Sequence, residues 1–139
     1  MTAAQRRGYL LETGQGLGGD PAVKSSGESS GGSLTLIESD TDGGAPWHVH
    51  EREDEAFYVL DGNIVVWCGD DEFHAGPRSF VFTPRGIPHA WDVERGERAT
   101  LLIMAAPGGL DAFLSEFHAA PDAAARDEVS ALYGVTFQK

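Results

Sequence analysis

Hydrophobic and polar residues alternate in short runs over residues 8–105, and clusters of turn residues separate these runs at close intervals. Alternation with a period of two is typical of strands that bury one face. Many short strands at such spacing predict an all-β sandwich or barrel with antiparallel strands. The expected strands cover residues 9–11, 22–25, 33–38, 47–50, 55–60, 63–68, 72–75, 79–83, 90–93 and 100–105.

The segments between the expected strands are rich in Gly, Asp and Ser, notably at residues 27–32, 40–44 and 69–71. These residue types accept left-handed backbone or make turn hydrogen bonds of their own. Asp61 and Gly62 separate two apolar runs, and this pair therefore predicts a β-hairpin between the strands on either side.

After residues 107–109 the hydrophobic period changes from that of a strand to that of a helix. Four residues at helical spacing form one apolar stripe: Leu110, Phe113, Leu114 and Phe117. The stripe predicts a short helix that covers the barrel. A second helix is expected over 123–133, because Asp122 can cap its start and Gly134 can end it. Residues 135–137 are expected to return to the sheet as an edge strand.

The chain has 139 residues, of which 41% are hydrophobic, and this suits one globular domain over residues 1–139. Its 22 acidic and 10 basic residues give a formal net charge of -12, which repels phosphate backbones and anionic lipid surfaces. We therefore expect neither nucleic acid nor a membrane as a partner. No run of about 18 apolar residues occurs, so we expect a soluble, cytoplasmic protein. The lone Cys68 excludes an internal disulfide.

Histidines and acidic residues cluster in the middle of the chain. His48 and His50 lie two positions apart in an expected strand, so their side chains project to the same side and can bind one ion together. His89 can bring a third imidazole from a distant strand. An acidic residue directly after the first two histidines would complete the site, and the candidates within reach are Glu51, Glu53, Asp54 and Glu55. Three nitrogens and one oxygen suit a divalent first-row metal.

The residues of this cluster resemble the two motifs of the cupin superfamily. The first motif contains H-x-H-x4-E-x6-G, which is matched by His48, His50, Glu55 and Gly62. The second contains P-x-G-x2-H, which is matched by Pro84, Gly86 and His89. Glu55 alone has both spacings of the first motif, so the resemblance implies a metal site of His48, His50, Glu55 and His89. The rest of the acidic run, Glu51, Glu53 and Asp54 with Arg52, is interpreted as a solvated turn.

Three positions depart from these motifs. Asp42 stands where the first motif has a leading Gly, Arg78 where the second has its leading Gly, and Val93 where the second has an Asn. None of the three is a metal ligand. The resemblance covers about residues 24–106 and implies a cupin barrel, a double-stranded β-helix or jelly roll, ahead of the short helical segment at about 109–133. It also implies a homodimer.

The alternation of side chains outlines a cavity above the expected metal. Phe57 and Val59 share a strand face with Glu55. Trp91 and Val93 follow the third histidine in the same way. These apolar residues either fill the barrel interior or form a wall against which one small guest binds.

On the strand at 100–105, alternation does not decide which pair of residues points inward. The two alternatives are Leu102 with Met104, and Leu101 with Ile103. We take Met104 as a candidate for contact with the substrate, beside Phe57, Val59, Trp91 and Val93.

The runs at 48–62 and 80–90 resemble the single-domain bacterial cupins related to quercetin-type flavonol dioxygenases. The resemblance implies a metal-dependent dioxygenase that acts on an aromatic, flavonol-like or polyketide-like enol, with Glu55 as the catalytic base. Its cofactor would be one divalent transition metal, and the ligand types admit iron, manganese, nickel, cobalt, copper or zinc. Two alternatives stay open: a metal-dependent polyketide cyclase or isomerase that does not use oxygen, and a non-catalytic small-molecule-binding module.

Overall fold

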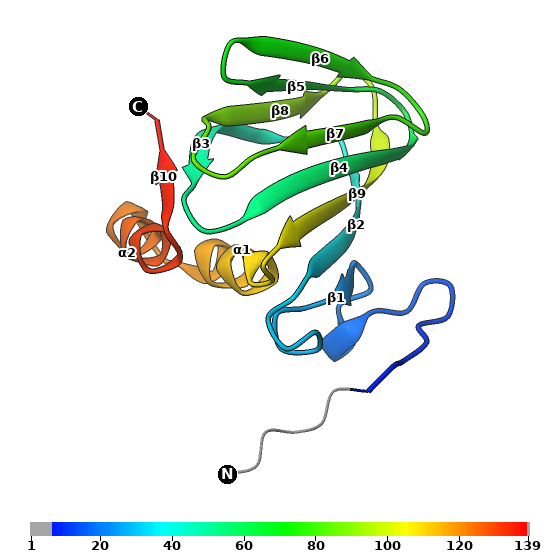
Figure 1. The fold of residues 1–139 in the computed structure, drawn as a ribbon, viewed down its shortest axis with the longest axis vertical. Helices are drawn as coiled ribbons and strands as arrows, with labels where there is room; N and C mark the ends of the chain where they lie inside the picture. The colour runs from blue at the N-terminus through cyan, green and yellow to red at the C-terminus, as the bar shows by residue number, and fades with distance from the viewer. Residues whose placement is uncertain (1–6, 139) are drawn as a thin grey trace.

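Two five-stranded antiparallel sheets face each other in the computed structural model of this chain, which describes residues 7–138 (Figure 1). In spatial order, the first sheet consists of β1 (Val23–Ser25), β2 (Thr35–Thr41), β9 (Ala99–Ala106), β4 (Asp54–Asp61) and β7 (Phe80–Thr83). The second consists of β10 (Val135–Phe137), β3 (Ala45–His50), β8 (His89–Val93), β5 (Ile64–Cys68) and β6 (Asp71–Ala75). This is the all-β jelly-roll architecture expected from the alternating pattern.

The side chains that point between the two sheets form the core. Along β9 every second residue from Ala99 to Ala105 is buried, while the residues between them are half-buried. Five apolar side chains are fully excluded from solvent: Phe57, Val59, Ile64, Val66 and Leu101. Burial of one such side chain contributes roughly 1.5–3 kcal/mol, so this layer is a main source of the stability of the sandwich.

The turn at Asp61 and Gly62 connects the two sheets and is not a hairpin, so that prediction is wrong. The strand before it, β4, pairs with β7 and β9, whereas the strand after it, β5, pairs with β6 and β8. Gly62 is required there, because its φ is +83° and an added Cβ would lie 2.5 Å from the carbonyl oxygen of Arg98. A two-residue hairpin instead joins β5 to β6, where Cys68 is paired with Asp71.

Arg78 stands at a turn where the resembled motif has a Gly. Its φ is +69°, a left-handed conformation that non-glycine residues rarely adopt. Its backbone N–H donates to the carbonyl oxygen of Val59 at 2.8 Å, which ties the turn to β4. The turn therefore keeps the backbone that a Gly would provide, although the residue differs.

The strand expected at 9–11 is not present, and this prediction is also wrong. Residues 9–11 have no regular secondary structure, although the Tyr9 hydroxyl donates to the carbonyl oxygen of Lys24 at 2.8 Å. A Gly-rich segment follows this run. Within that segment the structure has a short 3-10 helix, η1 (Leu17–Gly19), which the pattern did not predict.

The second C-terminal helix, α2 (Ala123–Tyr133), begins and ends where expected. The side chain of Asp122 accepts a hydrogen bond from the backbone N–H of Ala125 at 2.8 Å, and Gly134 ends the helix with φ +71°. The chain then enters β10, which pairs with β3, so the edge strand expected at 135–137 is confirmed. No helix within residues 7–138 is long and apolar enough to cross a membrane.

The first C-terminal helix, α1 (Leu110–Ala119), packs at one end of the sandwich (Figure 1). Its apolar stripe faces the interior, with Leu110 and Phe113 buried. Asp111 anchors the start of the helix, because its Oδ1 accepts hydrogen bonds from the Thr35 hydroxyl at 2.7 Å and the Gly27 backbone N–H at 3.0 Å. The helix therefore covers the end of the barrel, as its pattern predicts.

Candidate metal centre

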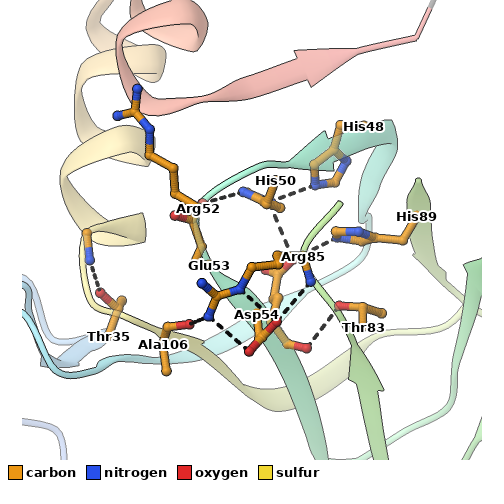
Figure 2. Close-up of polar contacts among 12 residues, drawn as sticks. Thr35, His48, His50, Arg52, Glu53, Asp54, Thr83, Arg85, His89 and Ala106 are labelled. Atoms are coloured by element: carbon orange, nitrogen blue, oxygen red, sulfur yellow. Dashed lines mark hydrogen bonds and ion pairs between the residues drawn. The ribbon is translucent and has the colours of Figure 1, made fainter. Parts of the chain in front are cut away.

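Four buried side chains converge between the two sheets beside α1. His48 and His50 come from β3, Glu55 from β4 and His89 from β8. Each is at most 6% exposed, and one ligand atom from each lies within 4.8 Å of the others. Pairing of β3 with β8 places His48 directly opposite His89. Figure 2 shows the three imidazoles turned toward one region.

Hydrogen bonds on the far side of two imidazoles determine which nitrogen faces the centre. The Nδ1 of His48 lies 2.6 Å from the carbonyl oxygen of Pro46, and the Nδ1 of His50 lies 2.6 Å from Oε1 of Glu53. A carbonyl oxygen and a carboxylate oxygen can only accept, so we assign the proton of each ring to Nδ1. Both Nε2 atoms then present lone pairs to the centre.

The two Nε2 atoms of His48 and His50 lie only 3.1 Å apart. Two lone pairs at this distance repel each other unless a proton on one ring or a metal cation lies between them. Oε1 of Glu55 adds a negative oxygen at 3.6 Å from the His50 Nε2 and 2.8 Å from the His89 Nε2. The residues present therefore fit a divalent metal bound by three nitrogens and one oxygen.

The electrostatics of the cluster keep His48 and Glu55 in the forms that bind metal. Burial, followed by the neighbouring charge of His89, lowers the pKa of His48 to about 4, so its ring is neutral at pH 7. Burial acts to raise the pKa of Glu55, but the hydrogen bond from His89 and the charge of His50 lower it further than burial raises it. Glu55 is therefore ionised at neutral pH.

His50 has the opposite shift from His48. Burial, the largest influence, lowers the pKa of His50, but the hydrogen bond to Glu53 and the charges of Glu55 and Glu53 raise it above its ordinary value. His89 differs again, because its Nδ1 is buried and has no hydrogen-bond partner within residues 7–138. The three imidazoles are thus supported in three different ways.

An apolar cavity of about 230 Å³ adjoins three of the four convergent residues, His48, His50 and Glu55. Its walls come from β3, β8, β9, β10 and α1, and its apolar side chains are Ala45, Pro46, Trp91, Ile103, Leu110, Phe113, Leu114, Phe117 and Phe137. Its polar lining side chains are His48, His50 and Glu55 at the buried end and the exposed His118.

The residues expected to contact a substrate lie in three different places. Trp91 lines the cavity. Phe57, Val59 and Val93 are packed inside the hydrophobic core. Met104 lies on the outer face of β9, so it is not placed to contact a guest in the cavity, and Ile103 on the inner face lines the cavity instead. Alternation along β9 contained both possibilities, and only the packing of the sheet decides between them.

Glu53 also differs from its interpretation as part of a solvated turn. Its side chain is 14% exposed and contacts His50, whereas Glu51 is exposed. Asp54 forms an ion pair with Arg85 at 3.2 Å. The run of acids gave no signal that separates Glu53 from its neighbours, because the inward bend of the turn depends on contacts with the distant C-terminal segment.

Most of the cavity-lining residues that were not predicted from the sequence belong to helix α1 and strand β10. The apolar stripe that contains Phe113 and Phe117 was expected to cover the barrel. Its two aromatic side chains could also have indicated that it lines a cavity for a ligand. Phe137 stacks on Phe117 with ring centroids 5.3 Å apart. His74 is not part of the cluster: it is exposed and contacts Glu72 at 2.9 Å.

Comparison with known proteins finds related sequences. A model of the cupin domain family matches residues 35–105. Quercetin 2,3-dioxygenase of Bacillus subtilis (strain 168) is 27% identical over 93 residues, which cover 62% of this chain and 28% of that protein. The chain therefore spans less than a third of the length of this relative.

Similar folds occur among solved structures. The protein TT1209 from Thermus thermophilus is 32% identical with a TM-score of 0.51, and the match covers 55% of this chain and 74% of that protein. The Cnp3 cupin domain of Schizosaccharomyces pombe is 20% identical with a TM-score of 0.50, over 57% of this chain and 59% of that domain. The second similarity concerns the fold alone.

Proposed function

Because this chain belongs to the cupin domain family, we propose that it is a metal-dependent dioxygenase acting on an aromatic, flavonol-like or polyketide-like enol. The observation that carries the proposal is the opening of a buried cluster of three imidazoles and one carboxylate onto an apolar cavity. The similarity to quercetin 2,3-dioxygenase supports an oxygen-dependent reaction, although the match covers 28% of that protein.

The proposed ligands of the metal are His48, His50, Glu55 and His89. When bound, a divalent ion of iron, manganese, nickel, cobalt, copper or zinc supplies Lewis-acid chemistry, and the redox-active ones among them also exchange electrons. Four protein ligands would leave room on a bound ion for a further ligand. A substrate oxygen can therefore reach the centre from the cavity.

Glu55 is the proposed general base. Its carboxylate is ionised, buried and part of the cavity lining, so it can accept a proton from a substrate hydroxyl that enters the cluster. The apolar wall around Trp91 and Phe113 excludes water from that proton and orients the ring of the substrate.

The cavity also sets the size of the proposed substrate. Its volume of about 230 Å³ is below the range of roughly 300–1,000 Å³ that encloses most drug-sized ligands. This volume favours a molecule of one or two rings over a three-ring flavonol. Small hydroxylated aromatics are therefore the first substrates to test.

The decisive experiment begins with protein purified without added metal and its elemental analysis. Metal-loaded protein is then incubated with flavonols and with smaller polyketide-like enols, under air and under nitrogen. Oxygen uptake that requires both metal and substrate supports the dioxygenase. Turnover of equal rate under nitrogen overturns it in favour of a cyclase or isomerase, and binding without turnover under either gas overturns it in favour of a binding module.

The proposal includes a homodimer in the cytoplasm. Support for the dimer comes from the outer face of the first sheet, where Phe80 and Phe82 of the edge strand β7 are 59% and 50% exposed. Phe82 lies in one row across the sheet with Ala56, its partner on β4, and Met104, the partner of Ala56 on β9. Exposed apolar residues on an edge strand are a ready surface for a second copy.

A further inference from the structure

The three imidazoles of the candidate metal centre differ in what holds the nitrogen that faces away from the metal. His48 donates to a neutral carbonyl group, that of Pro46, whereas His50 donates to the carboxylate of Glu53. The Nδ1 of His89 has no hydrogen-bond partner in the described part of the chain. Among these outward-facing nitrogens of the described residues, only that of His50 contacts a negative charge, the Glu53 carboxylate at 2.6 Å.

Glu53 is held in this position by the turn that carries it, between β3 and β4 (Figure 2). The backbone N–H of Glu51 donates to the carbonyl oxygen of Gly134 at 2.9 Å. The guanidinium of Arg52 donates to the carbonyl oxygen of Leu132 at 2.7 Å. Two contacts with the end of α2 thus secure the turn on its outer side, while the Glu53 side chain is turned inward and is 14% exposed.

We propose that Glu53 is a positioning residue that makes His50 the strongest of the three nitrogen donors. This inference rests on the proposed metal site. A carboxylate that accepts the Nδ1 proton fixes the tautomer and the ring orientation, and it increases the negative charge at Nε2, where the metal binds. The Pro46 carbonyl fixes the tautomer of His48 too, but because it is neutral it adds less negative charge at Nε2. The Nδ1 of His89 contacts neither a carbonyl nor a carboxylate in the described residues.

The neighbouring acids of the same turn provide the contrast. Glu51 is exposed, and its described contact is made by its backbone. Asp54 is bound to Arg85, whose Nε and backbone N–H both donate to it. Glu53 is thus the acid of this turn whose carboxylate contacts a proposed ligand from outside the cluster.

The test measures metal binding without any substrate. Affinities for Zn²⁺ and Co²⁺ are determined by competition with a chelator for the wild type, Glu53→Gln and the matched control Glu51→Gln. Each substitution removes one negative charge from the same turn, but only the first one changes the partner of His50. We expect Glu53→Gln to weaken binding about 10- to 100-fold and Glu51→Gln to change it less than about 2-fold.

The absorption bands of bound Co²⁺ separate a positioning role from a purely structural one. Glu53→Gln should shift these bands, because the donor strength of His50 changes, and Glu53→Asp should partly restore both the bands and the affinity. If Glu53→Gln lowers the unfolding midpoint of the metal-free protein, spectra recorded well below that midpoint still decide. Wild-type bands and affinity in Glu53→Gln, or equal losses in both Gln variants, would overturn the inference. A wild-type protein that binds no metal would instead overturn the proposed function.

Discussion

At the scale of single residues, the candidate ligands are the positions where a substitution should remove metal and activity together. His50→Ala and His89→Ala each delete one of three nitrogens that converge within 4.8 Å, so we expect both purified variants to contain no metal and to show no turnover. Elemental analysis and an activity assay check this. His74→Ala is the matched control, because His74 is exposed and bound to Glu72. Metal retained in both ligand variants would contradict the ligand set.

The pKa of His48 predicts how the metal-free protein responds to acid. The pKa is about 4 in the folded chain against an ordinary value of 6.5, so the unfolded chain takes up this proton first. The contribution of neutral His48 to the free energy of unfolding is fully present above pH 6.5. It is lost as the pH falls toward 4, and the loss amounts to about 3 kcal/mol. Urea unfolding of chelator-treated protein across this interval measures it.

His48→Gln serves as the reference for that measurement. The pKa of His50 shifts upward and contributes in the opposite direction, so only the difference between wild type and His48→Gln isolates the effect of His48. We expect the stability of the variant to depend less steeply on pH between 6.5 and 4. Equal slopes for the two proteins would show that burial does not depress this pKa.

The convergence of His48, His50, Glu55 and His89 could be predicted from spacing, because strand alternation and two turns determine which side chains face inward. The role of Glu53 could not. Residues 51–54 are all acidic or basic, and which of them bends toward the core depends on contacts with residues 132–134, about 80 positions later in the chain. Such long-range contacts leave no trace in a local pattern.

At the scale of secondary-structure elements, the connection between β4 and β5 should tolerate no side chain at Gly62. Gly62→Ala forces a Cβ to within 2.5 Å of the Arg98 carbonyl oxygen and also strains a left-handed φ, so we expect a loss of more than about 2 kcal/mol in unfolding free energy. Gly96→Ala is the control, because Gly96 has φ +78° but no described atom within 4 Å of the added Cβ. It should cost about 1 kcal/mol. Equal losses would contradict the steric argument.

Asp111 connects helix α1 to the first sheet, and its removal should affect the cavity as well as stability. Asp111→Ala leaves the Gly27 N–H and the Thr35 hydroxyl without their acceptor, which should cost about 1–3 kcal/mol. Because α1 forms one wall of the cavity, binding of aromatic guests should weaken too. Asp122→Ala removes the cap of α2 and should cost about 1 kcal/mol with guest affinity unchanged. Denaturant unfolding and fluorescence titration measure the two effects.

Strand and helix positions were largely predictable, whereas the sheet to which each strand belongs was not. Alternation and turn residues are local signals, and they located every strand of the two sheets to within a few residues. The hairpin expected at Asp61 and Gly62 failed because the same turn chemistry serves a hairpin and a crossing between sheets. Pairing of β4 with β9 rather than β5 depends on contacts between residues about 40 to 50 positions apart.

At the scale of the whole molecule, the outer face of the first sheet should determine the oligomeric state. We expect the wild type to sediment as a dimer and Phe82→Lys to shift it toward the monomer, because a charge replaces an apolar side chain that is 50% exposed on the edge strand. Phe73→Lys is the matched control, since Phe73 is 40% exposed on β6 of the other sheet. A monomeric wild type, or a dimer in both variants, would contradict the proposed interface.

The four candidate ligands come from opposite halves of the sandwich, since Glu55 lies in the first sheet and the three histidines in the second. A bound ion would connect the two sheets. Because the ion would bind the folded chain, the free energy of unfolding would rise with the logarithm of the free metal concentration. Scarcity of metal in the cell would then do more than slow turnover. It would also weaken the association of the two sheets and make the chain more susceptible to proteolysis. The lifetime of the protein would then depend on the concentration of available metal.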